Sequence, residues 1–445
     1  MAIQGPPIAS QLDREALDEA TALEPGRTSM LAALEYRDFR LFWFGLVVSN
    51  IGSWMQIYGL GWLVVQLAVR DGAPNLAPFY LGLVGIARAI PGVTFGLFAG
   101  VVADRSDRRR LLMVTQSSAA VVALILGALT ISDHINIVEV VLLSAITSLI
   151  FSFDAPTRQA MVPRLVPDRQ LLSAIGLNSA AFNGATLIGP LIGGVLIVPF
   201  GVGGLMIVNA ISYLAVLAAL VVISPQPVMQ RSRASMLDSV REGAGYIRRE
   251  PVLRWVVLLA ITTALFTRPY IQLLPAEAQF LRVGAVELSF LLAASGVGAL
   301  AGALITAALG GWERRGALLI GAVFAHGLLL SLFGLQSGLI GAMVFVGLTG
   351  LAVMVFLGMA NTLLQTRTPD HLRGRAMSVY TMVWIGLMPL GQMLLGGVGT
   401  FVGIDRAFLI GGVIVVTVAL YAAIRVPALR SATAESRAAP AARSG

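Results

Sequence analysis

The sequence predicts an all-α membrane protein in which 12 transmembrane helices form two six-helix halves related by pseudo-symmetry. Of the 445 residues, 57% are apolar and only 12% are charged, whereas soluble chains average about 45–50% and about 25%. Apolar runs of about 20 residues, the length that crosses a bilayer, recur along the chain. An offset of 202 residues carries Pro167 onto Pro369 and Gly189 onto Gly391, as expected for two related bundles.

The predicted elements follow in order. Residues 1–35 are polar and lack the features of a signal peptide, so they are expected to form a cytoplasmic tail. The N-terminal half (36–224) has apolar runs at 41–69, 79–103, 111–131, 138–153, 171–198 and 203–224. An arginine-rich cytoplasmic linker (225–254) follows. The C-terminal half (255–427) has runs at 255–277, 287–309, 316–336, 338–364, 375–400 and 403–425, and a second cytoplasmic tail (428–445) ends the chain.

The arginines predict the orientation. All 31 basic residues are arginine, and 26 of them fall in the tails, the linker and alternate loops when both termini are placed in the cytoplasm. Because arginine accumulates on the cytoplasmic side, we expect a multi-pass protein of a bacterial inner membrane with both termini inside. The same clustering argues against nucleic acid as a partner. No enzyme is expected, and neither a metal nor a cofactor: the chain has no cysteine, three scattered histidines, and no lysine for a phosphate-binding loop.

The loop after the second predicted helix carries a motif of acids and arginines. It reads Gly100-x-x-x-Asp104-Arg105-x-Asp107-Arg108-Arg109-Arg110-x-Leu112. Arginine can bind a carboxylate at two points, so such a loop can hold an ion pair at the membrane surface. The motif resembles the loop motif of the major facilitator superfamily, with Asp107 where the wider pattern has glycine. The resemblance implies a cytoplasmic gate, and a plain positive-inside anchor is the alternative.

Asp154, at the inner end of the fourth predicted helix, is the expected partner of that loop. By the same resemblance, Asp104 and Arg108 form with Asp154 a latch that breaks when the inside opens. Arg105 and Arg158 are expected to belong to the same gate. A turn-capping role of Asp154 in its Asp-Ala-Pro sequence is the alternative, and the two roles can coexist.

Small residues on the fifth helix form a second motif. Gly176-x8-Ala185-x3-Gly189-Pro190-x2-Gly193-Gly194 is similar to the antiporter motif of exporters in the superfamily, with Ala185 replacing one glycine. Small residues permit close helix packing and the proline bends the helix, so packing alone is the alternative. Further glycines on the second, eighth and eleventh helices are expected to serve the contacts of helices 2 with 11 and 5 with 8. They are Gly92, Gly96, Gly100, Gly298, Gly302, Gly386, Gly391, Gly396 and Gly397.

Three further segments narrow the resemblance. They are Tyr36-Arg37-x-Phe39-Arg40-x-Phe42 leading to Gly52-Ser53-Trp54-x-Gln56, Asp154-Ala155-Pro156-x-Arg158-Gln159, and Pro369-Asp370-x-x-Arg373-Gly374-Arg375-Ala376. With Asp107, they resemble the branch that contains the bacterial enterobactin exporter and related secretion-effector permeases. The resemblance covers about residues 34–425.

The ionisable residues inside the predicted spans are unusual for a proton-driven exporter. No acid lies deep in a span, and Glu139, Glu277 and Glu287 are near outer ends. Arg88, Arg268 and His326 lie mid-membrane, where an arginine must face water or a partner. Arg268 is expected to touch substrate or a nearby cluster of carbonyls. For Arg88, facing the cavity and bonding backbone freed by Pro91 are equal alternatives, and His326 is expected to be structural rather than a proton relay. Further candidates for the cavity lining are Asn50, Trp54, Gln56, Tyr270 and Gln272.

The expected function is secondary active export of a small organic molecule by alternating access. The two arginines favour a siderophore-like anion, with a drug as the other candidate, and the resemblance implies proton antiport. Lipids, protons and a small-molecule substrate are the expected partners, and a monomer is expected. An importer of the same fold and a non-transporting membrane sensor are the alternatives.

Overall fold

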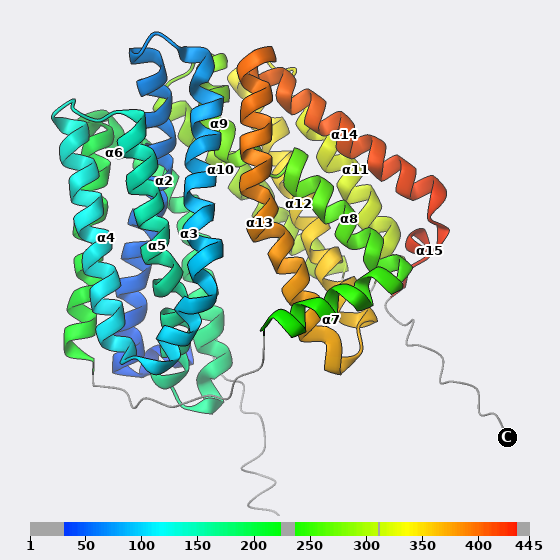
Figure 1. Ribbon diagram of the computed structural model, residues 1–445, viewed down its shortest axis with the longest axis horizontal. Coiled ribbons are helices and arrows are strands. Elements are labelled where there is room, and N and C mark those ends of the chain that lie inside the picture. The colour runs from blue at the N-terminus through cyan, green and yellow to red at the C-terminus, as the bar shows by residue number, and fades with distance from the viewer. Residues whose placement is uncertain (1–30, 224–235, 310–311, 434–445) are drawn as a thin grey trace, which may run out of the picture.

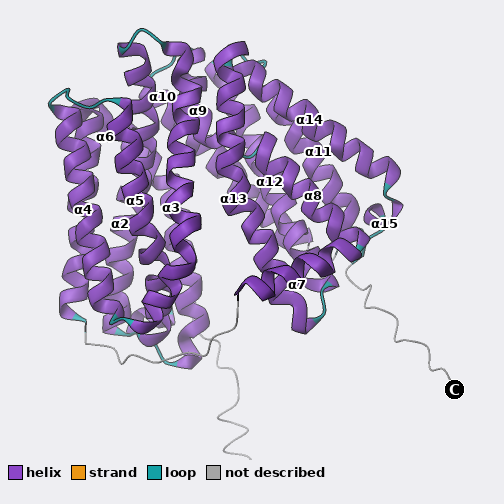
Figure 2. Cartoon of the chain, in the orientation of Figure 1, coloured by secondary structure: helices purple, strands orange, loops and turns teal. Residues whose placement is uncertain are grey.

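The computed structural model describes residues 31–223, 236–309 and 312–433. In this part of the chain all regular structure is helical (Figure 2). The N-terminal half contains α2 (Arg37–Arg70), α3 (Ala77–Arg105), α4 (Arg108–Ile131), α5 (Ile137–Met161) and α6 (Leu171–Val222). The remainder contains α7 (Met236–Arg249), α8 (Pro251–Phe266), α9 (Tyr270–Phe280), α10 (Ala285–Ala308), α11 (Arg315–Phe333), α12 (Leu339–Arg367), α13 (Asp370–Val402), α14 (Ile404–Arg425) and α15 (Pro427–Arg430). Short 3-10 turns are η1 (Ala32–Glu35), η2 (Pro74–Leu76), η3 (Val162–Arg164) and η4 (Asp168–Gln170).

Ten helical segments of the described residues are long and apolar enough to cross a membrane. One of them contains α6, whose 52 residues are interrupted at Gly201, where φ is 65°. Glycine adopts this left-handed conformation at little cost, so the chain turns there without a loop. Counting α6 as two spans, at the place where the sequence predicts a boundary, and adding α2 makes the structure compatible with 12 spans.

The seventh predicted span is broken near its middle. α8 ends at Phe266, Thr267 has φ −129° and ψ −45°, and α9 begins at Tyr270 after Pro269. Proline lacks the amide hydrogen that a continuous helix requires at this point. α9 is therefore a separate rod that packs against α2 and α3 of the other half as well as against α10, α13 and α14.

The two halves meet at one end of the molecule and diverge toward the other (Figure 1). We call the first the closed end and the second, where α7 lies, the linker end. At the closed end, Gln392 Nε2 on α13 donates to the carbonyl of Leu81 on α3 at 2.8 Å, and Tyr58 Oη donates to Ala285 O at 2.6 Å. A Cβ added to Gly82 would lie 2.8 Å from Met393 Cα. The predicted contact of helices 2 and 11 is thus present.

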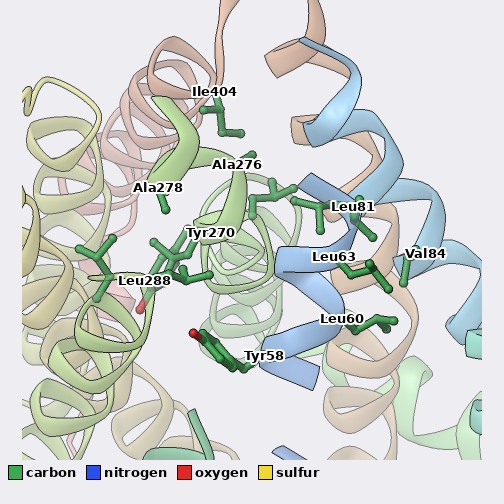
Figure 3. Packing of buried hydrophobic residues seen from close by; sticks show 14 of the residues in the cluster. Tyr58, Leu60, Leu63, Leu81, Val84, Tyr270, Ala276, Ala278, Leu288 and Ile404 are labelled. Carbon is green, nitrogen blue, oxygen red and sulfur yellow. The ribbon is translucent and has the colours of Figure 1, made fainter. Parts of the chain in front are cut away.

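The apolar core of the closed end is shared between the halves. One cluster of buried residues includes Leu63 and Leu81 from the N-terminal half and Leu288 and Ile404 from the other (Figure 3). Two further clusters belong to one half each. Many large apolar side chains also remain exposed on the outer faces of the helices, as Phe401 does at 89%, which suits a lipid solvent rather than water.

The glycine contacts agree only in part with those expected. On α3, Gly82 and Gly85 face α13, whereas a Cβ on Gly96 or Gly100 would meet no atom within 4 Å. On α10, Gly298 and Gly302 pack against α12 and not against α6. On α13, Gly396 meets Pro78 of α3 and Gly391 meets α8, while Gly386 and Gly397 have open space. Helices 5 and 8 do meet, but through Gly194 against Ser289 and Gly296 against Leu187.

Part of the predicted linker forms α7, which lies along the C-terminal half. Glu242 pairs with Arg375, and Gly243 packs against the Arg375 carbonyl. Tyr246 Oη donates to Arg367 O at 3.1 Å, and burial together with the nearby Glu250 carboxylate raises the pKa of this phenol, which keeps it a neutral donor. Because Arg367 ends α12 and Arg375 lies near the start of α13, α7 is attached to both helices at the linker end.

Candidate functional site

A cavity of about 470 Å³ lies between the halves, within the range of small-molecule sites. Five residues expected from the sequence line it: Asn50, Trp54, Gln56, Arg88 and Gln272. The other polar lining residues, which sequence reasoning missed, are Ser53, Ser144, Thr147, Ser148, Asn209, Tyr213 and Gln392. The remaining lining is apolar. The walls come from α2 to α6 on one side and from α9 and α13 on the other.

Arg88 is the charged residue of this lining among the residues that the structure describes. Its guanidinium makes no hydrogen bond or ion pair with another described residue, while its carbonyl accepts from Ser148 Oγ at 2.5 Å. The carbonyl contact connects α3 to α5, and the Arg88 side chain lines the cavity. A cation held in a largely apolar pocket without a partner attracts an anionic or strongly polar group.

A hydrogen-bonded polar wall connects α2 to the second part of α6. Asn209 Nδ2 donates to Gln56 Oε1 at 2.5 Å, and Ser53 Oγ lies 3.2 Å from Tyr213 Oη. Gly52 makes this approach possible, since a Cβ there would collide with the Ser212 and Asn209 side chains. The wall presents fixed amide and hydroxyl groups, which are uncharged and can orient a ligand by hydrogen bonds.

The fifth-helix motif supports an aromatic part of the lining. Trp54 meets Phe182 edge-on, with ring centroids 6.0 Å apart. Gly189 lies beneath it, and a Cβ there would be 2.6 Å from Trp54 Cβ. Gly193 packs against the Tyr58 ring, Ala185 is buried, and Gly176 meets nothing within 4 Å. Pro190 is buried inside the same helix. The motif therefore sets the distance between α6 and α2, which is a packing role at the edge of the cavity.

Arg268 and Tyr270 lie elsewhere than expected, since neither is among the described residues that line the cavity. Tyr270 is fully buried and its hydroxyl lies 2.7 Å from Ser295 Oγ. Arg268 is half-buried at the break between α8 and α9, where its amide donates to Thr263 O. His326 is buried beside Tyr270, with Nδ1 3.2 Å from Thr349 O, an arrangement that suits the structural role expected for it.

Asp154 is buried and makes its contacts within its own half. Arg158 Nε lies 2.5 Å from Asp154 Oδ2, while Thr115 Oγ1 and Gln116 Nε2 donate to Oδ1 at 2.9 and 2.6 Å. Arg158 also donates to Asn50 Oδ1 at 3.0 Å. Through Asn50, this ion pair reaches the cavity wall. Among the described side chains, Asp154 thus contacts Arg158 rather than Arg108 in this conformation.

The loop between α3 and α4 has a structural role besides the expected gate. Asp107, which stands where the wider pattern has glycine, accepts from the amides of Arg109 and Arg110 and so caps α4. Arg109 donates to the carbonyls of Leu220 and Val221 at the end of α6. Arg105 is exposed, and the Nε atom of Arg108 is buried without a partner among the described atoms. The side chain of Asp104 lies outside the described residues.

Three glutamates near the closed end have different surroundings. Glu139 accepts from the Asn136 amide at 2.9 Å, and Glu287 accepts from the Gly284 amide at 3.0 Å, so both complete helix caps. Glu277 is fully buried instead. Sequence reasoning grouped these three residues, because position in a span does not reveal local hydrogen bonds. In the described part of the chain, no three metal-binding side chains lie together.

Comparison with known proteins gives one family and one fold. A family profile described as transmembrane secretion effector matches residues 28–443. The multidrug efflux pump Tap of Mycobacterium tuberculosis (strain ATCC 25618 / H37Rv) is 28% identical over 399 residues, which are 88% of this chain and 93% of that protein. The macrolide efflux protein A of Streptococcus pyogenes is 22% identical over 390 residues, with coverages of 86% and 94%.

Solved structures share the fold at low sequence identity. The nucleoside transporter NupG superposes with a TM-score of 0.64 at 14% identity, covering 85% of this chain and 97% of that chain. A bacterial homologue of the human lysosomal transporter Spinster, in an inward-facing and unoccupied conformation, gives a TM-score of 0.63 at 15% identity, with coverages of 88% and 96%. At these identities the likeness concerns the arrangement of helices alone.

Proposed function

Because the chain belongs to the transmembrane secretion effector family of the major facilitator superfamily, we propose that it exports drug-like organic molecules by alternating access. The relatives named as multidrug and macrolide efflux pumps support export of drugs over a siderophore-like anion. The proton gradient is the proposed energy source. The proposal places both termini in the cytoplasm of a bacterium and the chain in its inner membrane, in keeping with the distribution of arginine.

One observation carries the proposal: the halves are in contact at the closed end and diverge toward the linker end, with the cavity between them. Gly92 lines the cavity, and Gly96 and Gly100 follow on the same face of α3 with open space beside them. On α13, Ile385 lines the cavity and is 58% exposed. With the linker end in the cytoplasm, this is an inward-open conformation that receives its substrate from the cell.

Closing the linker end is the step for which the gate is proposed. Arg108, whose Nε atom is buried without a partner among the described atoms, is the loop residue proposed to make a contact that forms on closure. Asp104 and Asp154 remain the proposed carboxylate partners, with Arg105 and Arg158 beside them. Since Asp154 already has three partners in this conformation, closure would require an exchange of partners rather than a new ion pair from free groups.

The chemistry of the lining favours neutral and anionic substrates over permanent cations. Arg88 contributes a positive charge, and no carboxylate is among the described lining residues. The amide and hydroxyl wall and the Trp54–Phe182 pair suit an amphipathic molecule with an aromatic or aliphatic body. A siderophore-like anion is the second candidate substrate on account of the same arginine.

Drug accumulation in an efflux-deficient bacterium tests this function. The host carries either the wild-type chain or an empty vector and is loaded with chloramphenicol (neutral), nalidixic acid (anionic) or ethidium (cationic). We expect the wild-type chain to lower accumulation of the neutral and anionic compounds more than that of ethidium, and an uncoupler to abolish the effect. Raised accumulation would indicate the importer, and no change in any compound would contradict drug export.

A siderophore is tested separately in the native host. Cells lacking the gene are grown without iron, and catecholates and hydroxamates are measured by mass spectrometry inside the cells and in the medium. Retention inside the deletion strain, reversed by complementation, would favour the second candidate. If neither drugs nor metabolites move, a non-transporting sensor becomes the better account.

A further inference from the structure

Glu277 is a buried carboxyl group that belongs neither to the cavity lining nor to the proposed gate. It lies on α9 with none of its surface exposed, and neither Oε1 nor Oε2 has a hydrogen-bond partner among the described residues. Its neighbours along the helix, Ala276 and Ala278, belong to the shared apolar cluster of the closed end, which Figure 3 shows around α9. An ionised carboxylate without a partner is very costly in such surroundings, whereas the neutral acid costs much less.

The charged surroundings do not compensate a negative charge at this position. Among the described residues of the elements packed against α9, the charged group that acts on Glu277 is the carboxyl of Asp405, on the first turn of α14. The elements α2, α3, α10 and α13 contribute none that does so. Two nearby carboxyl groups repel each other when both are ionised, so the pair favours a state in which one of them holds a proton.

The position of α9 connects this carboxyl to a moving contact. Pro275, two residues before Glu277, faces Gly61 of α2, and a Cβ on Gly61 would lie 2.8 Å from Pro275 Cγ. α9 also contacts α3 of the opposite half, and the break at Thr267–Pro269 separates it from α8. In alternating access, the closed end must open, and α9 must then leave α2 and α3. This movement gives water from that side of the membrane access to Glu277.

We propose that the carboxyl group of Glu277 is a proton-binding site that controls the closed end. When this end is open, the carboxylate takes a proton from water on that side, and the neutral acid is then buried as α9 packs against α2 and α3. When the end reopens, the O–H bond breaks and the proton returns to the same water. The inference rests on the alternating access of the proposed function and requires no particular substrate.

Double electron–electron resonance on spin-labelled protein in detergent micelles tests this proposal without any substrate. The sequence contains no cysteine, so labels can be placed at will. One pair, Asn75→Cys with Leu335→Cys, reports on the closed end, and a second pair, Leu172→Cys with His371→Cys, reports on the linker end; all four positions are exposed. Distances are recorded between pH 5 and pH 9 for the wild type and for Glu277→Gln.

For the wild type, we expect the closed-end pair to be near at pH 5 and to separate as the pH rises. One proton bound per closure changes the ratio of closed to open molecules by up to tenfold per pH unit. In Glu277→Gln this dependence should vanish, with the closed end remaining closed at pH 9. Glu277→Asp should retain it, which provides a second variant if the amide does not fold.

Two matched carboxyl variants complete the experiment. Glu287→Gln removes an acid of the same end that caps α10, and it should leave the pH dependence unchanged. Asp405→Asn should weaken the dependence without abolishing it, because it removes the repelling neighbour but not the proton-binding group. A pH dependence in Glu277→Gln equal to that of the wild type would overturn the proposal, and so would a wild type that does not respond to pH. If neither pH nor an exported drug moves either pair, alternating access itself fails.

Discussion

At the scale of single residues, two arginines in the described part of the chain have different relations to the cavity: Arg88 lines it, and Arg158 lies behind its wall. The guanidinium of Arg88 faces the lining without a partner among the described residues, whereas Arg158 is held by Asp154 and Asn50. The first is available to a ligand, and the second stabilises the wall behind it. The sequence analysis assigned Arg88 to the cavity and Arg158 to the gate, but it did not reveal that Asn50 links Arg158 to the cavity wall.

Replacing Arg88 should alter selectivity. In Arg88→Gln we expect export of nalidixic acid to fall at least about tenfold, since a hydrogen bond to a charged group contributes about 1.5–3 kcal/mol, while export of chloramphenicol stays near the wild-type rate. Accumulation assays on both compounds measure this. Arg268→Gln, at a position off the lining, is the control, and an equal loss of both compounds in Arg88→Gln would contradict the role given to it.

Breaking the Asp154–Arg158 pair should destabilise the N-terminal half. Asp154→Asn leaves a buried arginine without its counter-charge, which costs about 3–5 kcal/mol. Thermal unfolding in detergent, followed by tryptophan fluorescence, should show a lower midpoint. Adding Arg158→Gln to Asp154→Asn should restore part of the stability. If the double variant is as unstable as the sum of the two single variants, the residues are not coupled.

At the scale of elements, the contact of α3 with α13 shows what a glycine pattern can and cannot predict. The sequence predicts that helices 2 and 11 meet, and they do. On α3, the series Gly92, Gly96 and Gly100 was expected at this contact, yet Gly82 and Gly85 form it. On α13, Gly396 takes part in the contact as expected. Spacing identifies a face of small residues, but the tilt of two helices decides which portion of that face is in contact, and tilt is a property of the assembled bundle.

A bulky residue at this contact should hold the closed end apart. A Cβ at Gly82 would lie 2.8 Å from Met393 Cα, a backbone atom that cannot move aside, so Gly82→Val should lower drug export at least tenfold. The labels at Asn75 and Leu335 should report a longer distance. Gly96→Val, placed where nothing lies within 4 Å, should be less harmful in the inward-open state, and equal behaviour of both variants in the distance measurement would refute this interpretation.

The broken seventh span shows why part of the site could not be predicted. Tyr270 and Gln272 were both expected to line the cavity, but residues two apart on a helix point about 200° apart. Of these two residues, only Gln272 lines the cavity, whereas Tyr270 points into the C-terminal half. The break before Tyr270 sets the rotation of α9, and no local pattern specifies that angle. The candidates on the unbroken α2 and α3 line the cavity, and their contact with a substrate stays a prediction.

At the scale of the whole molecule, the two halves behave as bodies that touch at one end. At the closed end, hydrogen bonds and a shared apolar core join the two halves. At the linker end, glycines of α3 have no atom within 4 Å of their Cβ positions, and α7 is attached to one half only. Hydrophobic runs and the arginine distribution were sufficient to predict the fold class, because bilayer thickness and charge asymmetry act on the chain as a whole. The conformational state could not be predicted, since the inward-open and outward-open conformations place the same apolar runs in the membrane.

Accessibility from the two sides of the membrane tests orientation and state together. Met382→Cys on α13 and Asn75→Cys at the opposite end are both exposed. A maleimide that cannot cross membranes should label Met382→Cys in inside-out vesicles but not in intact spheroplasts, and the reverse should hold for Asn75→Cys. Labelling of Met382→Cys only from outside would reverse the proposed topology.

The turn at Gly201 has a consequence for how the molecule meets its surroundings. The chain passes from the first to the second part of α6 within a single residue, so that corner presents almost no free segment beyond the membrane. A protease or an antibody acting from that side would find its substrate or epitope at the turns around Gly72 and Asp133 instead. A peptide tag inserted after Gly72, whose Cβ position is unobstructed, should be tolerated, whereas the same tag at Gly201 would separate two helices that are joined directly.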